Sequence, residues 1–456
     1  MIDAKTIENK ITDHKTTLLQ RYKEIVELPS VSSQPAHHKD ILATAKLAAS
    51  FIEAAGGETR IFETKGNPVV WGRIENNPSY PTIAIYNHLD VQPAEKGKDG
   101  WTQEPFTFVE KDGVFYSRGT TDDKGPAITA LYGAIIAKEL DIKTNVEFIW
   151  ELEEEIGSPH FQDFLDQAKG ISKANSIIVS DTVWLTPDQP SMTMSMRGSF
   201  FFEISLTTGG KDLHSGLCGG AARNPLAEIA GIINHCMNPK TGEILIEGIA
   251  ESYEHPSEEI LDQFEQSGFS VSYFKEAHQL QSLRFDDVRS ITAHIWAKPT
   301  FEVHGIIGGY TGPGSKSIVP NTATAKISMR LVPGQDPYTI FELAKKHILT
   351  YCPDAHIELE PGMLKPFKAT TGTPENKKIE TSIEFGFGKK PVFAAEGGSI
   401  GAIVPMSETL QVPVYFMGLS LPEDSYHGPD ESFRWRQIEG GIKAYVKYFE
   451  LMGQPS

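Results

Sequence analysis

Short, mostly apolar runs alternate with longer amphipathic stretches in the first part of the chain. Thr82–Tyr86, Val146–Trp150 and Ser176–Val179 are four or five residues long and contain little polar interruption. Runs of this length predict strands that are buried on both faces of a largely parallel sheet. The stretches with helical periodicity are residues 3–28, 39–55 and 125–140. Strand and helix in alternation predict an α/β architecture.

The pattern changes at about residue 193. Ser199–Leu206 and Thr322–Leu331 alternate apolar and polar positions, which is typical of half-exposed antiparallel strands. Between these two strands, Asn224 and Pro225 precede a stretch with helical periodicity. This part of the chain therefore predicts an inserted α+β domain.

Short apolar strands return near the end of the chain. They are expected at residues 391–396 and 412–417, before a closing helix at 431–452. We therefore expect an α/β catalytic domain formed by residues 1–192 and 366–456. The inserted α+β domain then covers residues 193–365.

Composition removes several classes of function. The 456 residues are 39% hydrophobic, which suffices for packed cores. With 42 basic and 60 acidic residues, the formal net charge of −18 disfavours binding to nucleic acid or to an anionic membrane surface. Three widely spaced cysteines exclude a disulfide framework and a cysteine-based zinc site. The polar N-terminus and the lack of a long apolar run predict a cytoplasmic protein.

Chemically capable side chains follow the predicted buried strands. His88 follows the first strand, a glutamate-rich segment (151–155) the second, Asp181 the third, and His427 comes after the strand near 412–417. Each alone is typical of a solvated loop. In a parallel sheet, however, the carboxyl ends of the strands share one edge, where ligands bind. The sequence therefore predicts that these residues converge.

Two histidines with several carboxylates and no thiols form a ligand set suited to zinc, or less selectively to manganese or cobalt. The number of carboxylates exceeds what one ion needs. We therefore expect two ions that share a bridging carboxylate.

Seven segments, in this order, carry a resemblance to a known family: YNHLDVQP (86–93), SRGTTDDKGP (117–126), ELEEEIGS (151–158), SDTVWL (180–185), KDLHSG (211–216), SMRLVP (328–333) and EGGSI (396–400). Together they resemble the dinuclear zinc metallopeptidases. That family includes carnosinase-like and cytosolic non-specific dipeptidases, glutamate-releasing carboxypeptidases and acetylornithine deacetylase. The resemblance covers essentially the whole chain and is strongest to the dipeptidase branch.

The resemblance implies a ligand set for two zinc ions per subunit. His88 and Asp181 would hold one ion, Glu155 and His427 the other, and Asp122 would bridge them. Spacing leaves open whether Asp122 or Asp123 is the bridge. The family pattern favours Asp122, joined to Asp123 by a cis peptide bond.

The resemblance also assigns residues around the ions. Glu154 would be the general base, because a water between two metal ions needs a carboxylate to accept its proton. Asp90 would fix the imidazole of His88. Glu151 and Glu153 are expected to face solvent.

Residues outside the strand ends would bind the substrate. By resemblance, His214 of one subunit of a homodimer would stabilise the oxyanion in the other subunit, with Ser317 as a further contact across the dimer. Alternation places Arg330 on a polar sheet face, where its guanidinium can bind a substrate carboxylate, and Ser399 on a glycine-rich turn can bind the same group. The inserted domain would then serve as lid and dimerisation domain.

These expectations lead to hydrolysis of dipeptides by two zinc ions. Dipeptidases of this type carry a histidine soon after the second domain boundary, whereas residues 365–378 contain no histidine. This departure leaves the length of the substrate open. An N-acyl amino-acid deacylase or a carboxypeptidase with the same metal centre is the alternative. A catalytically silent binding protein is a third hypothesis, disfavoured because all five expected ligands and Glu154 are present.

Overall fold

A six-stranded sheet forms the centre of the larger part of the molecule. The computed structural model describes residues 2–454. The strand order is β1-β2-β6-β3-β7-β17, and within this sheet only β2 runs against the others. The strands are β1 (Glu58–Phe62), β2 (Val69–Ile74), β3 (Thr82–His88), β6 (Asn145–Glu151), β7 (Ser176–Val179) and β17 (Val414–Phe416). The predicted α/β class with a largely parallel sheet is confirmed.

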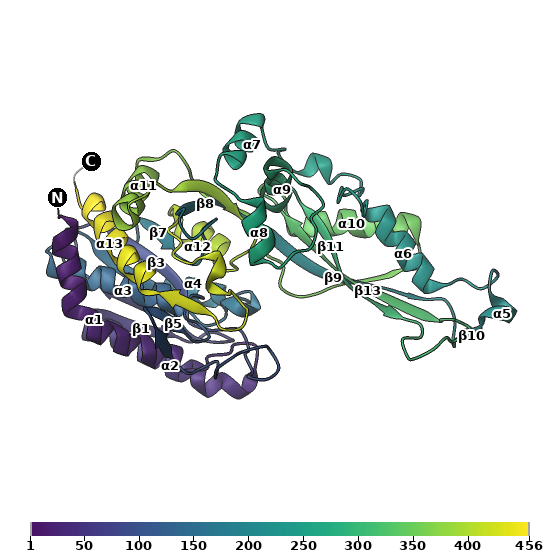
Figure 1. Ribbon diagram of the computed structural model, residues 1–456, viewed down its shortest axis with the longest axis horizontal. Helices are drawn as coiled ribbons and strands as arrows, with labels where there is room; N and C mark the ends of the chain where they lie inside the picture. The colour runs from purple at the N-terminus through teal and green to yellow at the C-terminus, as the bar shows by residue number, and fades with distance from the viewer. Residues whose placement is uncertain (1, 455–456) are drawn as a thin grey trace.

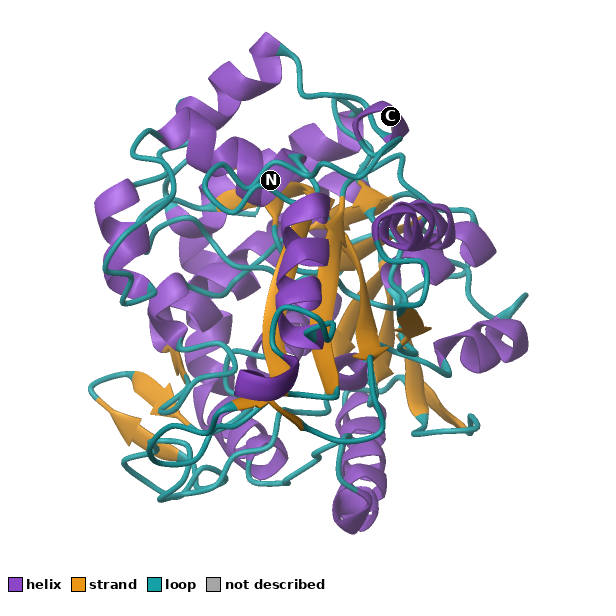
Figure 2. Ribbon diagram, turned by 90° about the vertical axis from the view of Figure 1, so that its right-hand side faces the viewer, coloured by secondary structure: helices purple, strands orange, loops and turns teal. Residues whose placement is uncertain are grey.

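Helices cover both faces of this sheet, and Figure 2 shows strands flanked by helices. One face packs against α1 (Ala4–Val26), α2 (His38–Ala54), α3 (Lys124–Glu139), α11 (Pro374–Phe387) and α13 (Trp435–Met452). The other packs against α4 (Phe161–Ala168) and α12 (Ile403–Leu410). Along β3, Ile83 and Ile85 contribute to the first core, whereas Ala84 and Tyr86 contribute to the second. Burial on both faces explains why this strand is almost continuously apolar.

A second body with its own core extends away from the first (Figure 1). Its antiparallel sheet has the order β11-β13-β9-β14, with bounds β9 (Gly198–Thr207), β11 (Thr300–Gly308), β13 (Thr322–Leu331) and β14 (His356–Leu359). Helices α6 (Pro225–Cys236) and α10 (Pro337–Tyr351) contribute to the same core. The Asn224 side chain caps α6 by accepting hydrogen bonds from the N–H groups of Leu226 and Ala227.

The tip of the second body is small and lies far from the central sheet (Figure 1). It consists of β10 (Leu213–His214), β12 (Ile318–Val319) and α5 (Ser215–Cys218). Three short helices lie instead beside the larger part, namely α7 (Glu258–Glu265), α8 (Val271–Ala277) and α9 (Val288–Thr292).

Two features near the C-terminus differ from the sequence prediction. The strand expected at 391–396 is β16 (Val392–Glu396), which joins β8 (Ser191–Met196) and β15 (Phe367–Lys368) in a separate sheet. The closing helix begins at Trp435, because β18 (Ser432–Arg434) pairs with β5 (Val114–Tyr116), whose other neighbour is β4 (Val109–Lys111). Local apolarity identified strands but not the sheet that each strand joins. None of the described helices is long and apolar enough to span a membrane.

Candidate metal centre

The carboxyl ends of three neighbouring strands carry the residues that the sequence singled out. β3 ends at His88, which lies beside Glu151 at the end of β6. The 3₁₀ turn that contains Glu154 and Glu155 follows β6, and Asp181 comes shortly after β7. Because these strands are adjacent and parallel, their ends share one edge. The loop after β17 brings His427 to the same edge.

Asp122 lies between the two histidines. Its Oδ1 atom is 2.9 Å from Nε2 of His88, and its Oδ2 atom is 3.1 Å from Nε2 of His427. Asp123 has a different partner: its carboxylate accepts a hydrogen bond from the Asn87 side chain at 2.8 Å. The peptide bond between the two aspartates is cis, as the sequence resemblance implied. The geometry therefore distinguishes two neighbouring aspartates that spacing alone could not.

The remaining expected ligands, Asp181 and Glu155, each lie close to one of the two histidines. Asp181 Oδ2 is 3.8 Å from Nε2 of His88, and Glu155 Oε2 is 3.1 Å from Nε2 of His427. Candidate ligand atoms form two groups that share His88, one with Asp122 and Glu155 and one with Glu154 and Asp181. Within each group, these atoms lie within 4.8 Å of one another. Such spacing is compatible with small cations held by several residues at once.

The electrostatics of this cluster are those of closely packed acidic groups. Burial and then the nearby Asp122 charge raise the pKa of Glu155 to about 7, and burial raises the pKa of Asp181 to about 6. Burial also raises the pKa of Glu154 well above its usual value. Hydrogen bonds to Asp122 and Glu155 raise the pKa of His427 to about 11. Carboxylates packed this closely repel one another when ionised, unless positive charge lies between them.

The donor set fits divalent cations. Imidazole nitrogens and carboxylate oxygens are ligands that zinc, manganese and cobalt accept. Among the described residues, buried Oδ2 of Asp122 faces Nε2 of His427 at 3.1 Å and accepts a hydrogen bond from no other group. A buried carboxylate oxygen with so few donors is costly unless a cation also reaches it.

Asp90 contacts both sides of the centre. Its carbonyl oxygen lies 3.0 Å from Nδ1 of His88, while its carboxylate lies 3.5 Å from the same nitrogen. The carboxylate accepts hydrogen bonds from the N–H groups of Glu154 and Glu155, each at 3.1 Å. Asp90 thus contacts the imidazole and also fixes the turn that carries the two glutamates.

The glutamates after β6 have different surroundings. Glu155 accepts hydrogen bonds from both the backbone and the side chain of Gln92, a residue that the sequence reasoning missed. The expectation that Glu151 and Glu153 face solvent is wrong, because both are buried. Glu151 accepts hydrogen bonds from Tyr86 and Ser158. Charge density alone did not reveal that partners inside the fold satisfy these carboxylates.

A second polar cluster contains Arg330 and Ser399. The Arg330 guanidinium donates to Ser399 Oγ at 3.3 Å, and Ser399 donates to the carbonyl of Arg197. Arg197, which the sequence reasoning missed, donates to the carbonyl of Gly397 at 3.1 Å. Burial and the neighbouring Arg330 charge lower the pKa of Arg197 to about 10. In the described part of the chain, the hydrogen bonds of the two guanidinium groups go to carbonyl and hydroxyl oxygens and not to a carboxylate, so this cluster is suited to an anionic group.

Glu396 is a further residue that the sequence reasoning did not assign. It lies three positions before Ser399, and burial followed by the nearby Asp181 charge raises its pKa. Its carboxylate accepts the N–H of Gly397 at 3.1 Å. A signal was present in the EGGSI motif, where a carboxylate adjoins the glycine-rich turn.

His214 and Ser317 lie together at the tip of the second body. His214 pairs with Ile318, and the N–H of Ser215 donates to the carbonyl of Ser317 at 3.0 Å. The tip is remote from the strand ends of the same chain (Figure 1). Within one chain, therefore, neither residue joins the cluster around Asp122.

A parallel sheet whose strand ends bring together histidines and several carboxylates is an arrangement typical of metal-dependent hydrolases. Residues 84–451 match the model of Peptidase family M20/M25/M40, and the chain belongs to that family. The family resemblance in the sequence is thereby confirmed.

Individual relatives cover nearly the whole chain. The Cys-Gly metallodipeptidase dug1 of Schizosaccharomyces pombe is 29% identical, with 98% of each chain covered. Human carnosine dipeptidase 1 superposes with a TM-score of 0.84 at 25% identity, with 99% of each chain covered. An M20 family metallo-carboxypeptidase, Sso-CP2 from Sulfolobus solfataricus, gives a TM-score of 0.86 at 29% identity, covering 96% of this chain and 99% of that one.

Proposed function

We propose that this protein hydrolyses dipeptides with the help of two divalent metal ions, zinc being the expected metal. The observation that carries the proposal is the position of Asp122, whose two carboxylate oxygens approach His88 and His427 separately. One carboxylate that serves two sites is suited to two ions about 3.5–4 Å apart. The names of the dipeptidase relatives support the same substrate class.

The ligand assignment follows the two sides of Asp122. His88 and Asp181 would hold one ion, Glu155 and His427 the other, with Asp122 between them. Manganese or cobalt would fit the same nitrogen and oxygen donors. Two bound ions would polarise the scissile carbonyl and lower the pKa of a water molecule.

Glu154 is the proposed general base. Its candidate ligand oxygen lies within 4.8 Å of a ring nitrogen of His88 and of a carboxylate oxygen of Asp181, so the carboxylate faces the cluster. It would accept a proton from the attacking water and return it to the departing amine. Asp90 would position Glu154 through the hydrogen bond to its N–H.

The length of the substrate follows from the positions of two oppositely charged receptors. Arg330 and Ser399 would bind the substrate carboxylate, and Glu396 would face the free amino group. Because Glu396 and Ser399 are three positions apart in the chain, their Cα atoms lie at most about 11 Å from each other. Receptors this close favour a substrate with both charged ends near the scissile bond, which describes a dipeptide.

A carboxypeptidase is the second candidate, supported by the likeness to Sso-CP2. Such an enzyme needs the carboxylate receptor but no receptor for an amino group. An N-acyl amino-acid deacylase has the same requirement. Glu396 therefore separates these activities from a dipeptidase.

The proposed enzyme is a homodimer in which residues 193–365 form the lid and dimerisation domain. β11 lies at the edge of its sheet and carries exposed apolar side chains, including Ile307 at 60% exposure. Leu217 at the tip is 83% exposed. Exposed apolar groups on an open edge favour pairing with a second chain. His214 and Ser317 would then act in the active site of the partner subunit.

Residues 1–192 and 366–456 form the proposed catalytic domain, acting in the cytoplasm. The deciding experiment loads the metal-free protein with zinc, manganese or cobalt and measures hydrolysis of dipeptides, longer peptides and N-acetyl amino acids. We expect metal-dependent cleavage of dipeptides above the other two classes. Cleavage of N-acetyl amino acids or longer peptides at equal or higher kcat/KM would contradict the dipeptidase assignment.

A further inference from the structure

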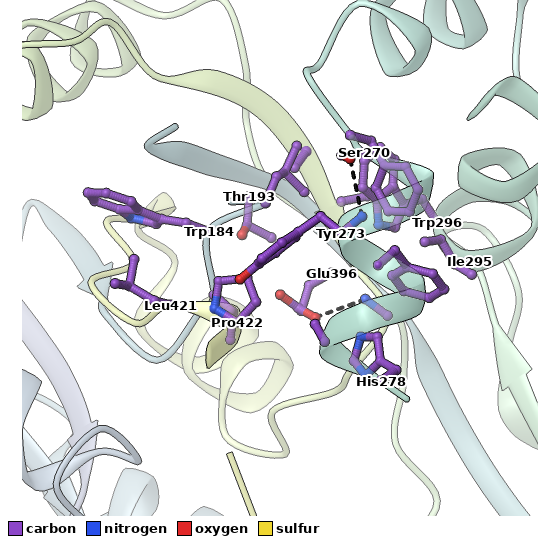
Figure 3. Close-up of a pocket in the computed structure, with 18 of the residues that line it drawn as sticks. Trp184, Thr193, Ser270, Tyr273, His278, Ile295, Trp296, Glu396, Leu421 and Pro422 are labelled. Carbon is purple, nitrogen blue, oxygen red and sulfur yellow. Dashed lines mark hydrogen bonds between the residues drawn. The ribbon is translucent and has the colours of Figure 1, made fainter. Parts of the chain in front are cut away.

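A cavity of about 300 Å³ lies beside the metal centre, between the larger part and the helices of the second body (Figure 3). We call it the aromatic cavity because six aromatic residues line it: Trp184, Phe269, Tyr273, Phe274, Trp296 and Tyr426. Its volume is at the lower end of the range, about 300–1,000 Å³, that is usual for ligand pockets. This volume leaves room for one large side chain.

The aromatic cavity adjoins the proposed metal ligands. Tyr426 lines it and donates a hydrogen bond from its hydroxyl to Asp181 Oδ1 at 3.0 Å. Val183 and Trp184, also in the lining, follow Asp181 in the chain. Glu396 lies at the cavity as well, near Tyr273 (Figure 3). The cavity is thus next to the Asp181 side of the centre.

Contacts between and within the two parts of the molecule hold the walls in place. Tyr273 of α8 donates a hydrogen bond to Glu423 Oε2 at 2.7 Å, in the 3₁₀ turn Pro422–Asp424. Phe269 packs edge-on against Trp296, with ring centroids 5.8 Å apart. The indole N–H of Trp184 donates to the carbonyl of Gly418. The polar edge of that ring is therefore satisfied, and its carbon surface remains for an apolar ligand.

The two charged receptors define which part of a substrate meets this cavity. The carboxyl end of a dipeptide would lie at Arg330 and Ser399, and its amino end at Glu396 near Asp181. The aromatic cavity adjoins Asp181 through Tyr426 and includes Glu396 in its lining, so it is nearest to the side chain of the N-terminal residue. A large apolar or aromatic side chain would bury its surface there. An N-terminal glycine has no side chain and would leave the apolar walls without a contact.

We propose that the aromatic cavity is the specificity pocket for the N-terminal residue of the substrate and selects dipeptides with a large apolar or aromatic residue at that position. The inference rests on the proposed dipeptidase function and adds the substrate preference. Rings in such a cavity can adopt edge-to-face packing against Phe269 or Trp296.

The test compares Phe-Gly, Leu-Gly and Gly-Gly, which share one C-terminal residue, on the metal-loaded enzyme. We expect kcat/KM for Phe-Gly to exceed that for Gly-Gly by about 10- to 100-fold, as for burial of one large apolar side chain. Two variants change the cavity in opposite ways. Ala277→Leu narrows it at an exposed lining position, and Phe274→Ala removes one wall. Each should lower the ratio of Phe-Gly to Gly-Gly by about fivefold or more.

Ala54→Leu is the matched control. Ala54 and Ala277 are both exposed and are each the last residue of a helix, but Ala54 lies on α2, outside the cavity. This control should leave the ratio unchanged. Equal kcat/KM for all three dipeptides, or a ratio that neither cavity variant alters, would overturn the proposal.

Two further results would also overturn it. A preference for Gly-Phe over Phe-Gly that the cavity variants abolish would assign the cavity to the C-terminal residue. Cleavage of N-octanoylglycine above Phe-Gly, lost in Ala277→Leu, would assign it to an acyl chain.

A binding measurement separates this inference from the proposed function. Trp184 and Trp296 line the cavity, so titration with L-phenylalanine should change tryptophan fluorescence, and titration with glycine should not. A protein that cleaves no dipeptide but shows this response would refute the dipeptidase function, and the cavity would remain only a binding site for a large side chain. Dipeptide cleavage without either the preference or the response would refute the cavity alone.

Discussion

The carboxylate of Asp90 accepts a hydrogen bond from the N–H of Glu154 at 3.1 Å. The same carboxylate lies 3.5 Å from Nδ1 of the His88 imidazole. One residue therefore couples the orientation of a proposed metal ligand to that of the proposed base. Losing it should disturb metal binding and catalysis together.

Asp90→Ala should lower metal affinity or kcat by about 10- to 100-fold, as for other residues that orient metal ligands. Asp90→Asn retains an acceptor oxygen and should lose less than Asp90→Ala. Metal titration by calorimetry and steady-state kinetics measure the two effects. Normal values for both variants would contradict a positioning role.

Glu154→Gln should retain both metal ions, because the five proposed ligands remain. It should lower kcat by about 10²–10⁴-fold, the usual loss when a general base is removed. Elemental analysis of the purified variant, followed by kinetics on the best dipeptide, checks the prediction. Near-normal turnover at full metal occupancy would remove Glu154 from this role.

Asp122→Ala should reduce metal content more than Asp123→Ala does. The Asp122 carboxylate approaches both His88 and His427, whereas that of Asp123 accepts a hydrogen bond from the Asn87 side chain. Metal content after dialysis against a limiting chelator gives the comparison. The opposite order would mean that Asp123 is the bridge.

Metal binding should release protons and strengthen as the pH rises. Asp122 and Glu155 raise the pKa of His427 from its ordinary value of 6.5 to about 11. At a pH between these two values, His427 of the metal-free protein keeps a proton, which a metal ion must displace in order to bind. Calorimetry in buffers of different ionisation enthalpy measures the released protons. Affinity that is constant from pH 6.5 to 8.5, with no proton release, would contradict this expectation.

His214→Ala should lower kcat by about 10²–10³-fold, as expected for loss of one oxyanion donor, with metal content unchanged. A mixture of this variant with Glu154→Gln tests whether His214 acts in the partner subunit. A mixed dimer has one site with both Glu154 and His214 intact. Random pairing of equal amounts should recover about a quarter of wild-type activity, since half of the dimers are mixed and each has one complete site.

The mixing experiment needs proof of subunit exchange, for example by native mass spectrometry of differently tagged variants. If exchange occurs and the mixture stays inactive, His214 acts within its own chain. Activity above that of either parent supports action across the dimer.

The sequence by itself determined the layered architecture and the edge at which the chemistry gathers. Thr82–Tyr86 is apolar at successive positions because β3 packs against a core on each face. Once such strands are parallel, residues after their ends must meet, as His88 and Asp181 do. These features follow from short-range patterns, and a sequence displays those directly.

The tertiary structure alone decided the burial of Glu151, the pairing of Arg197 with Ser399 and the existence of the aromatic cavity. Trp184, Tyr273 and Glu396 come from distant parts of the chain and meet only because the second body packs beside the central sheet. A residue's neighbours across such a contact depend on how whole elements pack, which local periodicity does not encode. Hence the sequence indicated where catalysis would occur, whereas the shape that selects a substrate required the folded chain.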